Sequence, residues 1–163
     1  MRTLLRLHRP VHCRPDVMRR RVRELARTTR TDPSALIARF EFRCDERRFA
    51  EELLSRSTQL WLYRTDQTLG CGDFVVVDMS APKPRDRRVT AVELKLRSKL
   101  RHGGHQLRNA ARAVDALASL GVVEAADVRR LTGERERLLR VLRERLSESG
   151  SDGEHRATPR AAH

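Results

Sequence analysis

The chain has 163 residues, a length that fits one domain with a modest hydrophobic core and excludes a multidomain enzyme. Its formal net charge of +13 attracts polyanions, so nucleic acid is the first partner to consider. Four Phe, one Trp and one Tyr fall mostly in apolar segments, which argues against a base-stacking platform for single strands.

Three widely spaced cysteines suggest neither a disulfide framework nor a zinc site, and they fit a reducing cytoplasm. The apolar stretch at the N-terminus is too short and too interrupted for a signal peptide. No stretch of the sequence has the length and apolarity of a membrane span. We therefore expect a cytoplasmic protein without a membrane partner.

The N-terminal half is expected to be helical. Residues 1–15 are basic and end at Pro15; a mobile arm and an edge strand are both compatible with them. Apolar residues at helical spacing predict a helix over 16–28, and Asp32 followed by Pro33 supplies the cap and first turn of another. That second helix is expected to run over 33–56, with a break near Cys44 as an alternative.

The middle of the chain has the pattern of a sheet. Strands are expected over 59–64, 73–79 and 89–97, the second of them buried on both faces. Residues 70–72 form a tight glycine loop, and the prolines within 80–86 keep that segment out of any strand.

Helices are expected again in the last third. An apolar stripe predicts a helix over 105–120 that ends at Gly121. Two more helices are expected, over 124–131 and 134–147, and the Arg-rich region 129–145 is interpreted as a solvated face. Residues 148–163 have too few apolar side chains for a core and are expected to be disordered. Residues 16–147 would then form the domain.

One lysine stands out among the basic residues. Only Lys83, Lys95 and Lys99 are lysines among the 35 basic residues, and Lys95 follows Glu93 by two positions. Lysine is a point charge whose pKa can be tuned, whereas arginine stays charged. Because side chains alternate along a strand, Glu93 and Lys95 lie on one face, which must look into a cleft.

Antiparallel pairing of strands 73–79 and 89–97 about a turn centred on Lys83 would place Asp73 opposite Glu93. Cross-strand neighbours are about 5 Å apart at Cβ. Two carboxylates that close repel each other unless a cation lies between them, so the pair predicts a site for magnesium, with manganese as an alternative. Lys95 beside such a metal predicts phosphodiester hydrolysis. The plain alternative is a solvated salt bridge on an edge strand.

Asp73 and the run Glu93-Leu94-Lys95 resemble the motif of the PD-(D/E)xK nuclease superfamily, over about residues 45–120. Gly72 departs from the proline that usually precedes the aspartate. The small restriction-endonuclease-like and Holliday-junction-resolvase-like members are the most similar. The resemblance implies an α/β fold in which a small mixed sheet is flanked by helices, with extra N- and C-terminal helices. It also implies a magnesium-dependent endonuclease.

The resemblance adds two candidate catalytic residues. A third carboxylate for the metal is expected from the helix before the sheet, with Glu46 the best candidate and Glu51 or Glu52 in reserve. Gln106, at the start of the helix after the Glu-x-Lys strand, would help to position the metal-bound water or the phosphate. Small members of the family often dimerise, so a homodimer or a larger protein partner is compatible with this length.

Basic residues near the motif are the expected contacts to nucleic acid, more plausibly DNA than RNA. Backbone contacts are assigned to Arg97, Lys99, Arg101 and Arg108. Two rivals stay open. The first is a catalytically inactive nuclease fold that binds nucleic acid or assembles a complex, and the second is a small basic helical interaction protein.

Overall fold

A computed structural model describes residues 4–95, 104–124 and 127–151, and over these ranges the chain forms five α-helices and one five-stranded mixed sheet. The strands are β1 (Leu4–Leu7), β2 (Leu60–Thr65), β3 (Phe74–Asp78), β4 (Arg88–Leu94) and β5 (Val128–Gly133). They are ordered β1-β2-β3-β4-β5. The pairs β1–β2, β2–β3 and β3–β4 are antiparallel, and β5 runs parallel to β4.

The helices are α1 (Pro15–Thr29), α2 (Pro33–Phe40), α3 (Cys44–Arg56), α4 (Ala110–Ser119) and α5 (Arg135–Ser151). A proline in the first turn begins both α1 and α2, where the missing N–H has no helical partner to lose. Asp32 caps α2 by accepting a hydrogen bond of 2.7 Å from the Ala35 N–H.

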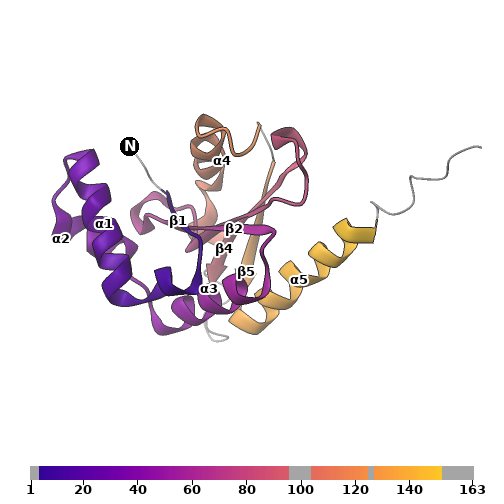
Figure 1. The fold of residues 1–163 in the computed structure, drawn as a ribbon, viewed down its shortest axis with the longest axis horizontal. Coiled ribbons are helices and arrows are strands. Elements are labelled where there is room, and N and C mark those ends of the chain that lie inside the picture. Colours follow the sequence, from indigo (N-terminus) through magenta and orange to yellow (C-terminus); the bar gives the residue numbers. More distant parts are fainter. Residues whose placement is uncertain (1–3, 96–103, 125–126, 152–163) are drawn as a thin grey trace, which may run out of the picture.

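The sheet is covered on both faces, as Figure 1 shows, with α3 and α4 on opposite sides of it. One core packs β3 and β4 residues such as Phe74, Val76 and Val92 against α1, α2, α3 and α5. The other packs Val75 and Val77 against α4. Burial on both faces explains the unbroken apolar run of β3.

The predicted register of β3 and β4 is confirmed. Phe74 pairs with Val92, Val76 with Thr90 and Asp78 with Arg88, which is the pairing expected for a turn centred on Lys83. The loop between the strands contains a short 3-10 turn at Pro84–Asp86. The register fixes which residues of β4 reach each face, because a slip by one residue would exchange the two faces.

The helix expected over 124–131 is wrong, because residues 128–133 form the edge strand β5. Val128 and Leu131 are three residues apart, which imitates a helical stripe, and arginine is a good helix former. Parallel pairing with β4 from Val89↔Val128 to Leu94↔Gly133 overrides that local preference. This tertiary pairing has no signature in the local sequence.

Other boundaries differ less. The expected helix over 33–56 is divided between α2 and α3, as the alternative near Cys44 anticipated, and the expected helix over 105–120 begins as a 3-10 turn at Gly104–Leu107. Of the two alternatives for the N-terminus, the structure has the edge strand, because Leu4–Leu7 form β1 at the edge of the sheet. The last helix continues to Ser151 instead of ending at 147, and residues 152–163 of the expected tail lie outside the described residues. No helix in the described ranges combines the length and apolarity needed to cross a membrane.

Candidate active site

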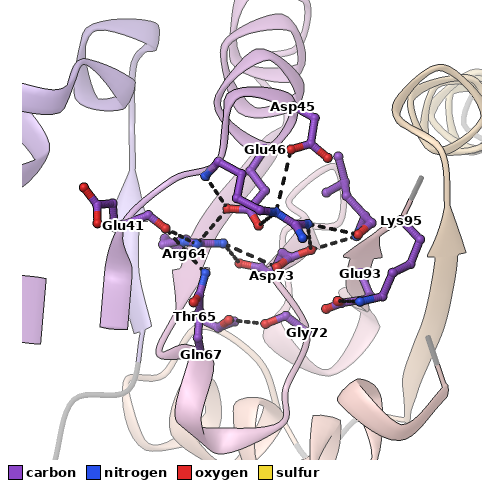
Figure 2. Close-up of polar contacts among 12 residues, drawn as sticks. Glu41, Asp45, Glu46, Arg64, Thr65, Gln67, Gly72, Asp73, Glu93 and Lys95 are labelled. Carbon is purple, nitrogen blue, oxygen red and sulfur yellow. Dashed lines mark hydrogen bonds and ion pairs between the residues drawn. The ribbon is translucent and has the colours of Figure 1, made fainter. Parts of the chain in front are cut away.

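A cavity of about 410 Å³ opens where β3 begins and β4 ends, between the first turn of α3 and the 3-10 turn at Gly104–Leu107. Three acidic residues from three different elements line it: Glu46 of α3, Asp73 before β3 and Glu93 of β4. These residues are nearly inaccessible, with relative exposures of 1%, 6% and 4%. The site residues are drawn in Figure 2.

Gly72 sets the position of Asp73. Its backbone φ is +85°, and a Cβ there would lie 2.6 Å from Leu107 Cδ2 and 2.7 Å from the Val92 carbonyl oxygen. The Gly72 N–H also donates to the Gln106 carbonyl at 2.9 Å. Proline has neither a positive φ nor an N–H, so the departure from the family motif at this position has a local structural cause.

Asp73 itself leaves the regular ladder between β3 and β4, which ends at Phe74. Its N–H donates to the Val92 carbonyl at 2.8 Å, and its Oδ2 accepts the Leu94 N–H at 2.8 Å. The carboxylate is therefore turned onto the end of β4. The expected placement of Asp73 and Glu93 at one cleft is what the structure has.

Glu46 is the acid that α3 contributes. Its Oε2 accepts the Arg43 N–H at 3.0 Å, which caps the helix, and its Oε1 lies 2.7 Å from Arg43 Nε. The reserve candidates point elsewhere: Glu51 pairs with Arg47, and Glu52 contacts arginines of α3 and α5. Helix periodicity alone could not decide between these three acids.

Arg64 ties Glu46 to Asp73, and the sequence reasoning missed it. It is fully buried in β2, and its Nη2 donates to Glu46 Oε2 at 2.9 Å. Its Nη1 lies 3.7 Å from Asp73 Oδ1 and donates to the Asp73 carbonyl at 3.0 Å. A signal was present, because Leu60, Leu62 and Arg64 alternate on one strand face. An arginine at a core position requires buried acceptors.

Glu93 and Lys95 form the second half of the site. Lys95 Nζ lies 2.8 Å from Glu93 Oε1, as Figure 2 shows, and the lysine side chain is only 10% exposed. The Lys95 N–H donates to the Gly133 carbonyl at 2.9 Å, so β5 extends the ladder past the end of β4 and fixes the lysine backbone. Thus β5, which was expected as a helix, supports the site.

Burial disfavours the charged forms of the acids in the cavity. Burial, reinforced by the charges of Glu46 and Glu93, raises the pKa of Asp73 to about 8, although Arg64 and the Leu94 N–H act in the opposite direction. Burial also raises the pKa of Glu93, against the opposing hydrogen bond from Lys95. Clustered carboxylates with raised pKa values are a feature of functional sites.

The donor atoms fit a hard divalent cation, since they are carboxylate oxygens with a backbone carbonyl beside them. In the described part of the chain, however, no three His, Cys, Asp or Glu side chains are arranged as a ready metal cage. The reason is visible in the contacts. The Glu46 and Asp73 oxygens face the guanidinium groups of Arg43 and Arg64, and Arg43 Nη2 also donates to the Leu94 carbonyl at 3.2 Å. The oxygen cluster already surrounds a positive charge, so a cation suits it.

The remaining expected residues are placed as follows. Gln106 lies on the 3-10 turn and lines the cavity with the three acids. Arg108 is exposed and lies beside Gly70, which lines the cavity: a Cβ added to Gly70 would be 3.7 Å from Arg108 Cγ. Arg97, Lys99 and Arg101 lie outside the described residues.

The candidate site is therefore defined by its own geometry: three buried acids, a lysine on one of them and a glutamine across the cavity. The likeness to PD-(D/E)xK nucleases stays a resemblance in motif and element order. No family model, curated protein or solved structure matches this chain.

Proposed function

We propose that the protein is a magnesium-dependent endonuclease of the PD-(D/E)xK type, which hydrolyses phosphodiester bonds in nucleic acid, with DNA as the preferred substrate. One observation carries the proposal. Glu46, Asp73 and Glu93 are buried together at one cavity, and Lys95 contacts Glu93 at 2.8 Å. Burying three carboxylates opposes folding unless positive charges lie against them, and such clusters are typical of functional sites, so we assign the cluster to function.

Asp73, Glu93 and Glu46 are the proposed ligands of Mg²⁺, with Mn²⁺ as a substitute. When bound, the ion would polarise a phosphate oxygen and make a coordinated water more acidic. The chain's own residues do the rest. Lys95 would orient the attacking water or stabilise the negative charge that develops on the phosphate, and the Gln106 amide would hold the water or the phosphate in place. Arg64 would keep Glu46 and Asp73 oriented.

The rest of the chain suggests the partner and the compartment. Arg97, Lys99, Arg101 and Arg108 are the proposed contacts to the nucleic-acid backbone, supported by the net charge of +13. All three cysteines are free thiols, which fits a cytoplasmic protein. A homodimer or a larger partner would supply a second active site for cleavage of both strands.

A second candidate function is a nuclease fold that binds nucleic acid or assembles a complex without cleaving. The observation that favours it is the set of ion pairs at the site. Arg43, Arg64 and Lys95 carry three positive charges against the three carboxylates. Such a centre could be satisfied without a metal.

Nicking of supercoiled plasmid in Mg²⁺ and in EDTA separates the two functions. We expect the wild type to nick only with Mg²⁺, and Lys95→Ala to lose about 100-fold or more in rate, as expected for removal of a positioned proton-transfer or charge-stabilising group. The matched control is Lys83→Ala, because Lys83 is exposed in the loop between β3 and β4. Its rate should equal that of the wild type.

The results divide clearly. Magnesium-dependent nicking that Lys95→Ala abolishes and Lys83→Ala preserves supports the enzyme. Plasmid binding without nicking in either buffer supports the non-catalytic module. Equal nicking by wild type and Lys95→Ala would show that Lys95 takes no part in the reaction and that the Glu-x-Lys motif does not indicate catalysis here.

A further inference from the structure

Two arginines contact the acidic cluster, and they are held very differently. Arg64 is fully buried, its Nε donates to the Phe40 carbonyl at 3.3 Å, and it lies against the rings of Phe42 and Phe74. The Arg43 side chain is 54% exposed. Arg64 is therefore a fixed part of the core, whereas the Arg43 head group can move without opening the core.

The Arg43 guanidinium lies among three oxygen acceptors that belong to three elements. Its Nε is 2.7 Å from Glu46 Oε1, and its Nη2 is 3.2 Å from the Leu94 carbonyl and 3.8 Å from Asp73 Oδ2. Two carboxylates and a carbonyl around one positive charge form the kind of oxygen set that a hard divalent cation takes. A guanidinium and a metal ion cannot share these oxygens at the same time.

The Arg43 side chain also borders open space into which it could rotate. It borders a cavity of about 250 Å³ lined by residues of α1, α2 and α3, and another of about 330 Å³ lined with Asp45, Arg48 and Arg135. Its Nε is already 3.7 Å from Asp45 Oδ1, and Figure 2 shows Asp45 beside Glu46. An outward rotation would exchange one carboxylate partner for another at the surface.

We propose that Arg43 is a tethered cation that fills the oxygen set of Glu46, Asp73 and the Leu94 carbonyl, and that a divalent metal ion must displace it. The inference rests on the proposed function, because it concerns the same metal site. Arg43 neutralises the acids while the metal is absent. The apparent metal affinity is then the intrinsic affinity multiplied by the fraction of time for which Arg43 is away from the site. Metal loading and outward rotation of Arg43 are then one coupled event.

The test is calorimetric titration of the full chain with Mg²⁺ and with Mn²⁺. Arg43→Gln keeps the backbone N–H that donates to Glu46 Oε2 but removes the competing charge. If Arg43 leaves the site for about one tenth of the time in the wild type, Arg43→Gln should bind the metal about tenfold more tightly. Arg43→Lys should stay nearer the wild type. Arg56→Gln is the matched control, since it removes an equal charge from an exposed position at the far end of α3.

A second readout is thermal unfolding, which does not rely on the heat of metal binding. Without metal, Arg43→Gln should unfold at a lower temperature than the wild type because the acids lose a countercharge, and Mg²⁺ should raise its unfolding temperature by more. Equal metal affinity in wild type, Arg43→Gln and Arg56→Gln would overturn the tethered cation while leaving the metal site intact. Absence of metal binding in all of them would overturn the proposed metal site and this inference with it.

Discussion

At one end of β3 and β4, Asp78 is paired in register with Arg88, and at the other end Asp73 and Glu93 share a cavity. Asp78 is half-buried, Arg88 is exposed, and the Asp78 carboxylate accepts the Ser80 N–H at 2.9 Å. At this end a charge of each sign lies at the surface. At the other end two acids are buried close together, with Arg64 against Asp73 and Lys95 against Glu93.

The difference separates two roles for acids on the same strands. Opposite charges across a strand pair contribute modestly to stability and cost little, because water solvates them. Buried like charges oppose folding, and the fold at that end also holds a glycine at positive φ and a fully buried arginine. The end of the two strands whose folding costs more free energy is the one that we assign to catalysis.

The largest expected effect is on cleavage. Asp73→Asn and Glu93→Gln should each reduce magnesium-dependent nicking about 100-fold or more, because each removes a charged metal ligand with little change of shape. Asp78→Asn makes the same chemical change at the far end of β3 and should keep the wild-type rate. A nicking assay on the three variants decides it. Equal losses at Asp73 and Asp78 would erase the distinction between the two ends.

The next effect is on stability at the glycine before Asp73. Gly72→Ala should lower the free energy of unfolding by about 3 kcal/mol, since the new methyl group clashes with Leu107 and the Val92 carbonyl in addition to the cost of positive φ. Gly121→Ala is the control. Its φ is +70° and nothing lies within 4 Å, so only about 1 kcal/mol should be lost. Urea unfolding measures both variants. Equal losses of unfolding free energy in Gly72→Ala and Gly121→Ala would contradict the close packing at Gly72.

The third effect is the pH dependence of stability in EDTA. The pKa of Asp73 is raised in the folded state, so between its unfolded value and about 8 the folded protein binds more protons than the unfolded chain. The stabilisation present at low pH should therefore be lost as pH rises through this window, by up to about 1.4 kcal/mol per pH unit for one group. Mg²⁺ should oppose the loss. Thermal unfolding of wild type and Asp73→Asn across pH 5–9 tests this, and an unchanged slope in the variant would assign the titration elsewhere.

The smallest effect is on nucleic-acid binding. Replacing Arg97, Lys99 and Arg101 together by Ala should weaken binding to all sequences and flatten its salt dependence by up to about 0.9 for each lost phosphate contact. The matched control removes three exposed arginines, Arg129, Arg137 and Arg140, from β5 and α5. A flatter slope in the control alone would move the nucleic-acid path to that Arg-rich surface.

The sequence predicted the parts of the fold that depend on local patterns. The N-cap at Asp32, the helix end at Gly121 and the register about Lys83 are each carried by a few adjacent residues, and all three are found. Strand β5 was taken for a helix because its place depends on pairing with β4, which lies more than thirty residues earlier in the chain. Non-local pairing is what a local pattern cannot encode.

The site divides in the same way. Alternation and register brought Asp73, Glu93 and Lys95 together from the sequence, since each of those arguments concerns one pair of neighbouring strands. The choice of Glu46 over Glu51 and Glu52 depends on how α3 meets the sheet. Arg43 and Arg64 were missed because their partners come from three elements, although the core position of Arg64 was a usable signal.

Calorimetric titration of Mg²⁺ into wild type, Asp73→Asn and Asp78→Asn tests the central claim most directly, namely that the buried end of β3 and β4 is a divalent-cation site. We predict one site in the wild type, an affinity at least about tenfold weaker in Asp73→Asn, and an unchanged affinity in Asp78→Asn, since carboxylate charge sets the affinity of such sites. Wild-type affinity in Asp73→Asn, or no binding by the wild type, would contradict it.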